Sequence, residues 1–327
     1  MSVNRQNILE VNQLIKEFKI GRWRKAKTVH AVNDFSLTLK KGEVVALVGE
    51  SGSGKTTVAR VIARLYEPTD GTMKLSNENI PKKMSRKDLL KFHRKVQMIF
   101  QDPFASLNPL QSIRYILSRP LKIHGLAEGP AIEEKVIKLL EQCGLIPAEQ
   151  YLDKLPHELS GGQRQRVGIA RALAVGPELI LADEPTSMLD VSIRLDIMNL
   201  MLDLKDEEGI SYIFITHDLA GAHYMADRIA IMYAGHLVEV GPSDVVINDP
   251  YHPYTQLLKE AAPKPESGLK PVPVDTTQEV PDLTNLPEGC PFAPRCDHAQ
   301  AECLKKVPPL LEVEPNRWSR CIFKDKR

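Results

Sequence analysis

Three short runs of apolar residues divide the chain, and each is followed by glycine-rich or polar sequence. They are Val44-Val-Ala-Leu-Val48, Leu179-Ile-Leu-Ala182 and Ser211-Tyr-Ile-Phe-Ile-Thr216. A short apolar run without alternation is typical of a strand that is buried on both faces of a parallel sheet. The pattern therefore predicts an α/β fold, in which ligands bind where the strands end.

Apolar residues at helical spacing predict helices between these strands. One helix begins at about Lys55, a second runs through Val167–Leu173, and a third spans Ala131–Cys143, with Gly144 as its C-cap. Residues from about 105 to 165 interrupt the strand pattern, so we expect a helical region there.

The composition is that of a globular protein without a membrane-spanning part. With 327 residues, of which 43% are hydrophobic, the chain can bury one large core and carry an appendage. Its formal net charge of +1 argues against a dedicated nucleic-acid-binding protein. No segment approaches the roughly 20 apolar residues of a membrane span, and the N-terminus lacks the apolar core of a signal peptide. We therefore expect a cytoplasmic protein, any membrane part of which is a separate chain.

A phosphate-binding loop follows the first apolar run. Gly49-Glu-Ser-Gly-Ser-Gly-Lys55-Thr56 has the required spacing. Its glycines let backbone N–H groups turn towards an anion, and the next helix directs the positive end of its dipole to the same place. Lys55 supplies a charge for the β- and γ-phosphates, and the Thr56 hydroxyl is placed to ligate Mg²⁺. A glycine-rich turn without a ligand is the alternative, which the flanking strand and helix disfavour.

Further polar residues follow the other expected strands. Asp183, after the second run, is placed to hold Mg²⁺ directly or through water, and Glu184 to act as the general base for the attacking water. An acidic pair that opens an exposed turn is the alternative. His217 follows the third run at the same sheet edge as the phosphate loop, where it would sense the γ-phosphate. Gln101 ends a fourth strand and is placed to reach Mg²⁺ or the water.

A second anion site is expected at Leu159-Ser-Gly-Gly-Gln163. Ser160 is a good N-cap for the helix that follows, and Gly161 and Gly162 expose N–H groups at its start. Because the chain has one phosphate loop, the natural ligand of this second site is the nucleotide bound to another subunit. An ordinary capped helix is the alternative.

In this order the motifs resemble those of the ATP-binding-cassette (ABC) ATPases, over about residues 8 to 260. The resemblance identifies Walker A (Gly49–Thr56), the signature (Leu159–Gln163), the D-loop (Ser187–Asp190), the Q-loop glutamine, Walker B and the switch histidine. Met188 of the D-loop stands where alanine is commoner. The fold implied is a P-loop NTPase of ABC type, with a helical subdomain inserted at about 105–165 and ATP bound between two cassettes.

The resemblance also implies a set of site residues. Phe18, ahead of the phosphate loop, would stack on adenine, although the Arg22–Val29 insertion blurs the register. The full set for ATP is Phe18, Gly49, Ser51, Gly52, Ser53, Gly54, Lys55, Thr56, Thr57, Gln101, Ser160, Gly161, Gly162 and Gln163. The Mg²⁺ ligands would be Thr56, Gln101 and Asp183, and the catalytic residues Glu184, His217 and Gln101.

Four of the five cysteines lie at the C-terminus, after a proline-rich segment. They are Cys290, Cys296, Cys303 and Cys321, spaced C-x₅-C-x₆-C-x₁₇-C. In a cytoplasmic chain such clustered thiols favour a metal over two disulfides. The spacing lacks the close pairs that zinc sites use, whereas iron–sulfur clusters tolerate several spacings. The fifth, Cys143, lies on the apolar face of an expected helix and is interpreted as a core residue.

The C-terminal part resembles the extension of oligopeptide/dipeptide-type importer ATPases, on His252-Pro-Tyr-Thr255 and Gly289-Cys-Pro-Phe-Ala-Pro-Arg-Cys296. Some of those carry a [4Fe-4S] cluster there, which favours a cluster over zinc or free thiols. We accordingly divide the chain into a nucleotide-binding domain (1–260), a proline-rich linker (261–288) and a cysteine extension (289–327). Segments after Gln101 and Gln163 are similar to the F-type subunit of such importers.

The resemblance implies an ATPase subunit that powers import of peptides or a related small solute, with oligosaccharides and nickel as alternatives. The expected partners are a homologous ATPase subunit, two membrane permease subunits and an extracytoplasmic solute-binding protein, but no nucleic acid. The expected location is the cytoplasmic face of the membrane. A soluble ABC ATPase acting on DNA or ribosomes is disfavoured, because the chain has one Walker A, one signature and no long coiled coil.

Overall fold

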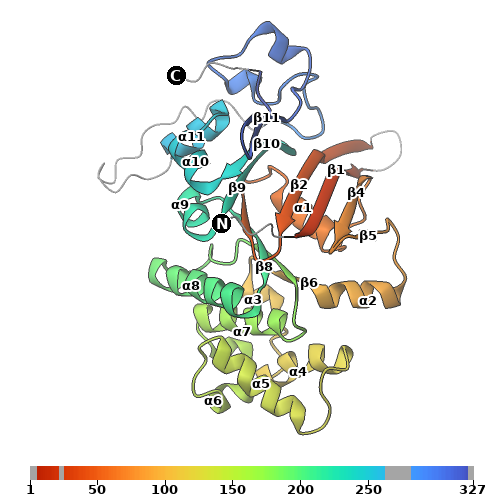
Figure 1. Cartoon of the computed structure of the whole chain (residues 1–327). Helices are drawn as coiled ribbons and strands as arrows, with labels where there is room; N and C mark the ends of the chain where they lie inside the picture. The colour runs from red at the N-terminus through yellow and green to blue at the C-terminus, as the bar shows by residue number, and fades with distance from the viewer. Residues whose placement is uncertain (1–5, 22–25, 262–280, 323–327) are drawn as a thin grey trace. The chain divides into compact units, whose positions relative to one another are not determined.

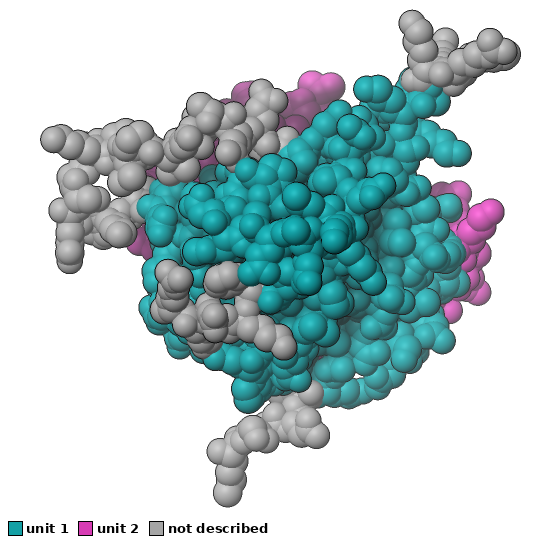
Figure 2. Space-filling model, turned by 90° about the horizontal axis from the view of Figure 1, so that it is seen from above, with its two compact units in different colours: residues 1–40, 44–82, 214–327 teal, residues 41–43, 83–213 magenta. Residues whose placement is uncertain are grey.

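The computed structural model describes residues 6–21, 26–261 and 281–322. Most of the expected linker (262–280) and residues 22–25 of the Arg22–Val29 insertion therefore lie outside the described residues. The chain forms two compact units, coloured separately in Figure 2. Unit 1 comprises residues 1–40, 44–82 and 214–327, and unit 2 comprises residues 41–43 and 83–213.

Unit 1 contains an antiparallel sheet formed by the N-terminal part of the chain (Figure 1). Its strands are β1 (Asn7–Ile20), β2 (Lys27–Lys40), β4 (Asp70–Leu75) and β5 (Glu78–Ile80), in the order β2-β1-β4-β5. Buried and exposed positions alternate at the end of β2, where Leu37 and Leu39 are buried and Thr38 and Lys40 are exposed. This period of two is that of a strand with one buried face.

The second sheet of unit 1 holds the strand that leads to the phosphate loop. Within unit 1 the strand order is β11-β12-β10-β9-β3, with β3 (Val44–Val48), β9 (Arg228–Tyr233), β10 (His236–Pro242), β11 (Leu311–Glu314) and β12 (Arg317–Ser319). All five residues of β3 are buried, and β3 pairs with β9 in parallel. The expectation of a parallel strand buried on both faces is confirmed for Val44–Val48.

The helices of unit 1 follow these strands. They are α1 (Lys55–Ile62), α9 (Leu219–Met225), α10 (Ser243–Asn248), α11 (Pro253–Ala261) and the 3₁₀ turns η3 (Ala293–Arg295) and η4 (Ala301–Leu304). The expected third apolar strand is β8 (Ser211–Thr216), which is buried throughout. It belongs to both units, because the boundary falls between Ile213 and Phe214.

Unit 2 combines two parallel strands with a group of helices. The strands are β6 (Val96–Ile99) and β7 (Leu179–Asp183). The helices are α2 (Arg86–Lys95), α3 (Pro103–Ser106), α4 (Ile113–Ile123), α5 (Ala131–Gln142), α6 (Glu149–Leu152), the 3₁₀ turn η2 (Pro156–Glu158), α7 (Gly161–Leu173) and α8 (Val191–Glu208). In Figure 1, α4 and α5 lie beside α7, and α6 packs on α4. The described residues between β6 and β7 contain no strand.

The expected helix at Ala131–Cys143 is observed as α5. It ends one residue earlier than expected, with Cys143 as C-cap and Gly144 beyond it at a positive φ of 69°. Cys143 is fully buried, as expected of a core residue. Burial raises the pKa of its thiol to about 12. None of the helices in the described residues is long and apolar enough to cross a membrane.

The C-terminal extension contributes strands to the sheet of unit 1. Strand β12 pairs with β10, and Arg317 of β12 is fully buried against Glu239 of β10, with an Nη2–Oε1 distance of 2.8 Å. Glu239 also accepts hydrogen bonds from the backbone N–H groups of Tyr251 and His252, at 3.0 and 2.9 Å. A buried carboxylate with this many donors is satisfied. The pair therefore fixes the extension to the core of unit 1.

His236, at the start of β10, is a buried neutral histidine. Its Nδ1 lies 3.0 Å from the carbonyl oxygen of Ala234, which assigns the ring proton to Nδ1. Burial, together with the nearby positive charge of Arg320, lowers the pKa of His236 from 6.5 to about 4. Between these two pH values the unfolded chain binds a proton at this ring and the folded chain does not.

We therefore expect the free energy of unfolding to fall on acidification between pH 6.5 and about 4. His236→Asn keeps a side-chain N–H for Ala234 and removes the titrating ring. In this window the free energy of unfolding of the variant should fall less steeply than that of the wild type, by about 1.4 kcal/mol per pH unit. Urea unfolding across and above the window measures the effect. If the free energies of unfolding of the wild type and the variant fall with the same slope below pH 6, the prediction is wrong.

Candidate functional site

The phosphate loop of unit 1 lies between β3 and α1 and depends on two of its glycines. A Cβ atom at Gly49 would lie 2.2 Å from the carbonyl oxygen of Met232. Gly54 has a φ of 101°, and a Cβ there would lie 2.4 Å from the carbonyl oxygen of Ala31. Any side chain at either position would force the backbone apart. The loop path is therefore available only to the glycines.

Lys55 lies folded back across this loop. Its Nζ donates to the carbonyl oxygens of Gly49 and Glu50, at 2.7 and 2.8 Å, and the side chain is buried. Among the described residues no side chain caps α1, and its first turn has no acidic residue. The start of the helix thus offers N–H groups and a positive dipole end to an anion, beside the lysine charge. Thr56 and Thr57 lie in the same first turn.

Unit 2 brings together two of the expected catalytic residues. Glu184 follows the buried Asp183 at the end of β7, and its carboxylate Oε2 accepts a hydrogen bond from Nε2 of Gln101 at 3.0 Å. Glu184 has a φ of 46°, in the left-handed region that glutamate rarely adopts. Such strain is maintained where the position of a side chain matters for function. Gln101 and Glu184 come from loops 83 residues apart.

His217 and Phe18 belong to unit 1. His217 is exposed after β8, next to Asp218, whose carboxylate caps α9 by accepting from the N–H of Ala220 at 3.0 Å. Phe18 lies on β1, with its ring edge-on to Tyr66 at a centroid distance of 5.3 Å. The ammonium of Lys16 is 4.7 Å from the Phe18 ring centroid. His217 and Phe18 thus belong to unit 1, whereas Gln101 and Glu184 belong to unit 2.

The signature segment starts α7 with a capping box. Ser160 Oγ accepts from the N–H of Gln163 at 3.3 Å, and the N–H of Ser160 donates to Gln163 Oε1 at 3.0 Å. The expectation that Ser160 caps this helix is confirmed. At Gly162 a Cβ would lie 2.7 Å from Cγ2 of Ile193, so this glycine allows the helix start to pack on α8.

Two arginines of α7 connect the signature helix to the segment after Gln101, a link that the sequence analysis missed. The Arg164 guanidinium lies 3.9 Å from the ring centroid of Phe104, and it donates to the carbonyl oxygen of Leu159. Arg171 donates to the carbonyl oxygen of Ser106 at 2.6 Å. The sequence signal was present, since arginines follow the signature at helical spacing, but their partners lie about 60 residues away.

The four C-terminal cysteines line one cavity of unit 1 together with His252 and His298. The cavity is small, about 20 Å³, or room for about one water molecule. Among the described residues none of the four forms a disulfide, and Cys303 Sγ accepts from the N–H of Gln300 at 3.4 Å. However, the described residues contain no group of three or more histidine, cysteine or acidic side chains placed to hold a metal ion. The side-chain positions therefore do not support a metal centre, although the thiols converge.

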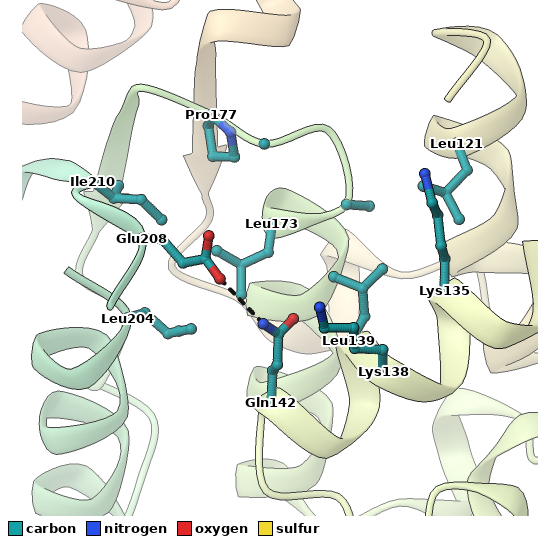
Figure 3. A pocket seen from close by; sticks show the side chains of 12 residues that line it. Leu121, Lys135, Lys138, Leu139, Gln142, Leu173, Pro177, Leu204, Glu208 and Ile210 are labelled. Carbon is teal, nitrogen blue, oxygen red and sulfur yellow. Dashed lines mark hydrogen bonds between the residues drawn. The ribbon is translucent and has the colours of Figure 1, made fainter. Parts of the chain in front are cut away.

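A larger pocket of about 450 Å³ lies within unit 2 (Figure 3). Leucine side chains line it together with Lys135, Lys138, Gln142 and Glu208, and Gln142 donates to Glu208 at 3.2 Å. None of the expected ATP-site residues lines this pocket. It is therefore separate from the motifs described above.

Comparison with known proteins identifies the family of the chain. Residues 32–187 match the family described as ABC transporter, and residues 238–303 match the oligopeptide/dipeptide transporter C-terminal region. The chain is 43% identical over 322 residues to the putative oligopeptide transport ATP-binding protein YkfD of Bacillus subtilis, covering 98% of this chain and 96% of the relative. It is 50% identical over 262 residues to the oligopeptide transport ATP-binding protein OppF of the same species, covering 80% and 84%.

Among solved structures, the chain is similar to the dimeric post-hydrolysis state of the ATP-binding cassette MJ0796 bound to ADP and Pi. The TM-score is 0.64 at 32% identity, covering 72% of this chain and 98% of the other. The chain belongs to the ABC transporter family, in its oligopeptide/dipeptide group. It is an ABC ATPase of P-loop fold, and ATP and Mg²⁺ are the ligands that fit it.

Proposed function

We propose that this chain is the ATP-hydrolysing subunit of a peptide importer and that it acts through a separate membrane permease. The observation that carries the proposal is the hydrogen bond that holds Glu184 against Gln101 beside the buried Asp183. A positioned carboxylate next to a metal-binding carboxylate is what activation of a water for attack on phosphate requires. The match of residues 238–303 to oligopeptide/dipeptide transporters supports peptides as the solute.

ATP would be bound mainly by unit 1. The phosphate loop, including Ser51, Gly52 and Ser53, surrounds the β- and γ-phosphates with Lys55 and the N–H groups at the start of α1. Phe18 stacks on the adenine. Its position beside Lys16 and Tyr66 provides an aromatic surface for this contact.

Hydrolysis would use the polar residues that follow the buried strands. Thr56, Gln101 and Asp183 would hold Mg²⁺, which supplies positive charge to the phosphates. Glu184 accepts the proton of the attacking water, and Gln101 holds that carboxylate in place. His217 contacts the γ-phosphate and so reports whether it is present.

Two cassettes would share each ATP. Ser160, Gly161, Gly162 and Gln163 at the start of α7 contact the nucleotide bound by the phosphate loop of the other subunit. The partner is a homologous ATPase subunit, so that two ATP molecules close a head-to-tail heterodimer. Closure moves two membrane permease subunits, and a solute-binding protein outside the membrane delivers the peptide. The chain therefore lies on the cytoplasmic face of the membrane.

Solute uptake tests the proposal. In a strain that lacks this chain, a plasmid copy should restore uptake of a labelled oligopeptide, and the Lys55→Ala copy should not. Restoration of nickel or oligosaccharide uptake alone would reject peptides and retain the transport role. Copurification with ribosomes or DNA, without a permease, would reject transport altogether.

We further propose that the cysteine extension (289–327), which follows the nucleotide-binding domain (1–260) and the linker (261–288), binds a [4Fe-4S] cluster. The support is that Cys290, Cys296, Cys303 and Cys321 line one cavity and that a backbone N–H donates to Cys303 Sγ. Since the side chains are not arranged as a metal site, cluster binding would require them to turn.

Metal content decides between the alternatives for this extension. Anaerobically purified protein should contain about four irons and four sulfides per chain, and Cys→Ser at any of the four positions should lower the iron content. If the protein instead contains one zinc per chain, the extension holds a zinc site and not a cluster. Protein without metal would reject both.

A further inference from the structure

The C-terminal region of the chain holds one residue of the phosphate loop. Glu50 is the second residue of that loop, and its carbonyl oxygen accepts from Lys55 Nζ at 2.8 Å. Its backbone N–H donates to the hydroxyl of Tyr254 at 2.9 Å. Its carboxylate accepts two hydrogen bonds from the guanidinium of Arg295, at 2.9 and 3.1 Å. Glu50 is therefore held at its main chain and at its side chain.

The side chain of Arg295 is held by contacts other than the one to Glu50. Its side chain is only 12% exposed, and its guanidinium lies 5.7 and 5.8 Å from the ring centroids of Tyr233 and Phe292. Nη1 also donates to the Tyr233 hydroxyl at 3.4 Å. An arginine with two parallel bonds to a carboxylate and aromatic neighbours loses little further freedom on pairing. The pair is thus more rigid than an exposed ion pair.

Tyr254 and Arg295 contact the same two aromatic rings, those of Tyr233 and Phe292. The Tyr254 ring lies 4.6 Å from that of Tyr233 and 5.4 Å from that of Phe292, centroid to centroid, and Tyr254 is fully buried. Arg295 follows Phe292 in the 3₁₀ turn η3, between Cys290 and Cys296. The contact to the phosphate loop is therefore built on the core of the extension and on α11.

We propose that Arg295 and Tyr254 are positioning residues for ATP binding, which act through Glu50. This inference rests on the proposed role of Gly49–Thr56 as the phosphate loop. A carboxylate at the second position of that loop would repel a triphosphate unless a cation neutralised it, and Arg295 supplies the cation. Tyr254 holds the main chain at the same residue, because its hydroxyl accepts from the N–H of Glu50 at 2.9 Å. The extension thus completes the nucleotide site.

ATP affinity of the full-length chain, measured by calorimetry, tests this proposal through a double-mutant cycle. Arg295→Met leaves the Glu50 charge without its partner, and we expect the Kd for ATP to rise about tenfold or more. Glu50→Gln removes the repelling charge and should change the Kd by less than about threefold. In the double variant the charge is absent from both sides, so affinity should return to near the wild-type value. In the assembled complex, Arg295→Met should raise KM and leave kcat at saturating ATP nearly unchanged.

Arg320→Met is the matched control. Arg320 lies in the same extension and pairs with Asp34 at 3.1 Å. Its side-chain hydrogen bonds to described residues go to Leu237, Pro308 and Asp34, outside the phosphate loop. It should leave the Kd for ATP unchanged. If Arg295→Met folds poorly, Arg295→Lys keeps the charge without the two parallel bonds and should give an intermediate Kd.

Two outcomes separate this inference from the function on which it rests. If Lys55→Ala binds ATP as the wild type does, the phosphate-loop assignment itself is wrong. If Lys55→Ala loses ATP while Arg295→Met binds it normally, only the positioning role is wrong. A Kd that stays raised in the Arg295→Met/Glu50→Gln double variant would also overturn the role, because it would indicate general damage to the extension.

Discussion

Replacing Glu184 by glutamine is expected to lower ATP turnover by about 10²–10⁴-fold while ATP binding persists. The amide has the size of the carboxylate and can still accept the hydrogen bond from Gln101 Nε2. It cannot take a proton from the attacking water. Because hydrolysis is what reopens the dimer in this scheme, the variant should accumulate in the closed, ATP-bound form. Phosphate release and size-exclusion chromatography with ATP measure both effects.

Glu178→Gln is the matched control for this prediction. Glu178 precedes β7 at its other end, and its carboxylate lies 3.8 Å from Lys95 Nζ. This substitution should leave turnover within about twofold of the wild type, as is usual for surface changes away from a site. In the assay the ATP site of the homologous partner subunit must be inactivated, so that the measured turnover comes from this chain. Near-normal turnover of Glu184→Gln under that condition would remove Glu184 from the role of general base.

The second large effect is expected at the signature. Ser160→Arg places a long cationic side chain at the start of α7, where the proposed partner nucleotide lies. We expect no closed dimer and a loss of turnover of about 10²-fold or more, because the N–H groups of the helix start no longer reach the phosphate. The Kd of the isolated chain for ATP should not change, since the proposed ligand of this helix start is the nucleotide of the other subunit and not the chain's own.

Ser160→Thr separates the helix cap from the shared site. Threonine also caps helices, so it should preserve the bond to the Gln163 N–H and the stability of α7. Its turnover should stay much closer to that of the wild type than the turnover of Ser160→Arg. A fall in ATP affinity of the isolated Ser160→Arg chain would contradict a shared site, because it would place the signature at the chain's own nucleotide.

Local pattern was sufficient for the strands and for the motifs attached to them. The apolar run Val44–Val48 and the helix start at Lys55 are encoded by neighbouring residues, so the sequence identified both. The capping box of Ser160 and Gln163 spans only three residues and was equally accessible. Such features depend on backbone preference and burial within a few residues.

Long-range contacts explain what the sequence did not indicate. The Arg295–Glu50 pair joins positions 245 residues apart, and nothing near either residue specifies the other. The same holds for Arg317 of β12, whose burial against Glu239 inserts the extension into the sheet of unit 1. The cysteine spacing predicted a C-terminal extension that binds a metal, and it did not indicate that this extension adds β12 to the sheet of unit 1.

ATP hydrolysis in proteoliposomes tests the central claim most directly. The chain, its partner ATPase and the two permease subunits would be reconstituted with ATP inside the vesicles and a solute-binding protein outside. The account predicts that a labelled oligopeptide accumulates inside and that phosphate release rises when the binding protein carries peptide, with both effects absent in Glu184→Gln. Hydrolysis that is indifferent to peptide, without accumulation inside the vesicles, would contradict it.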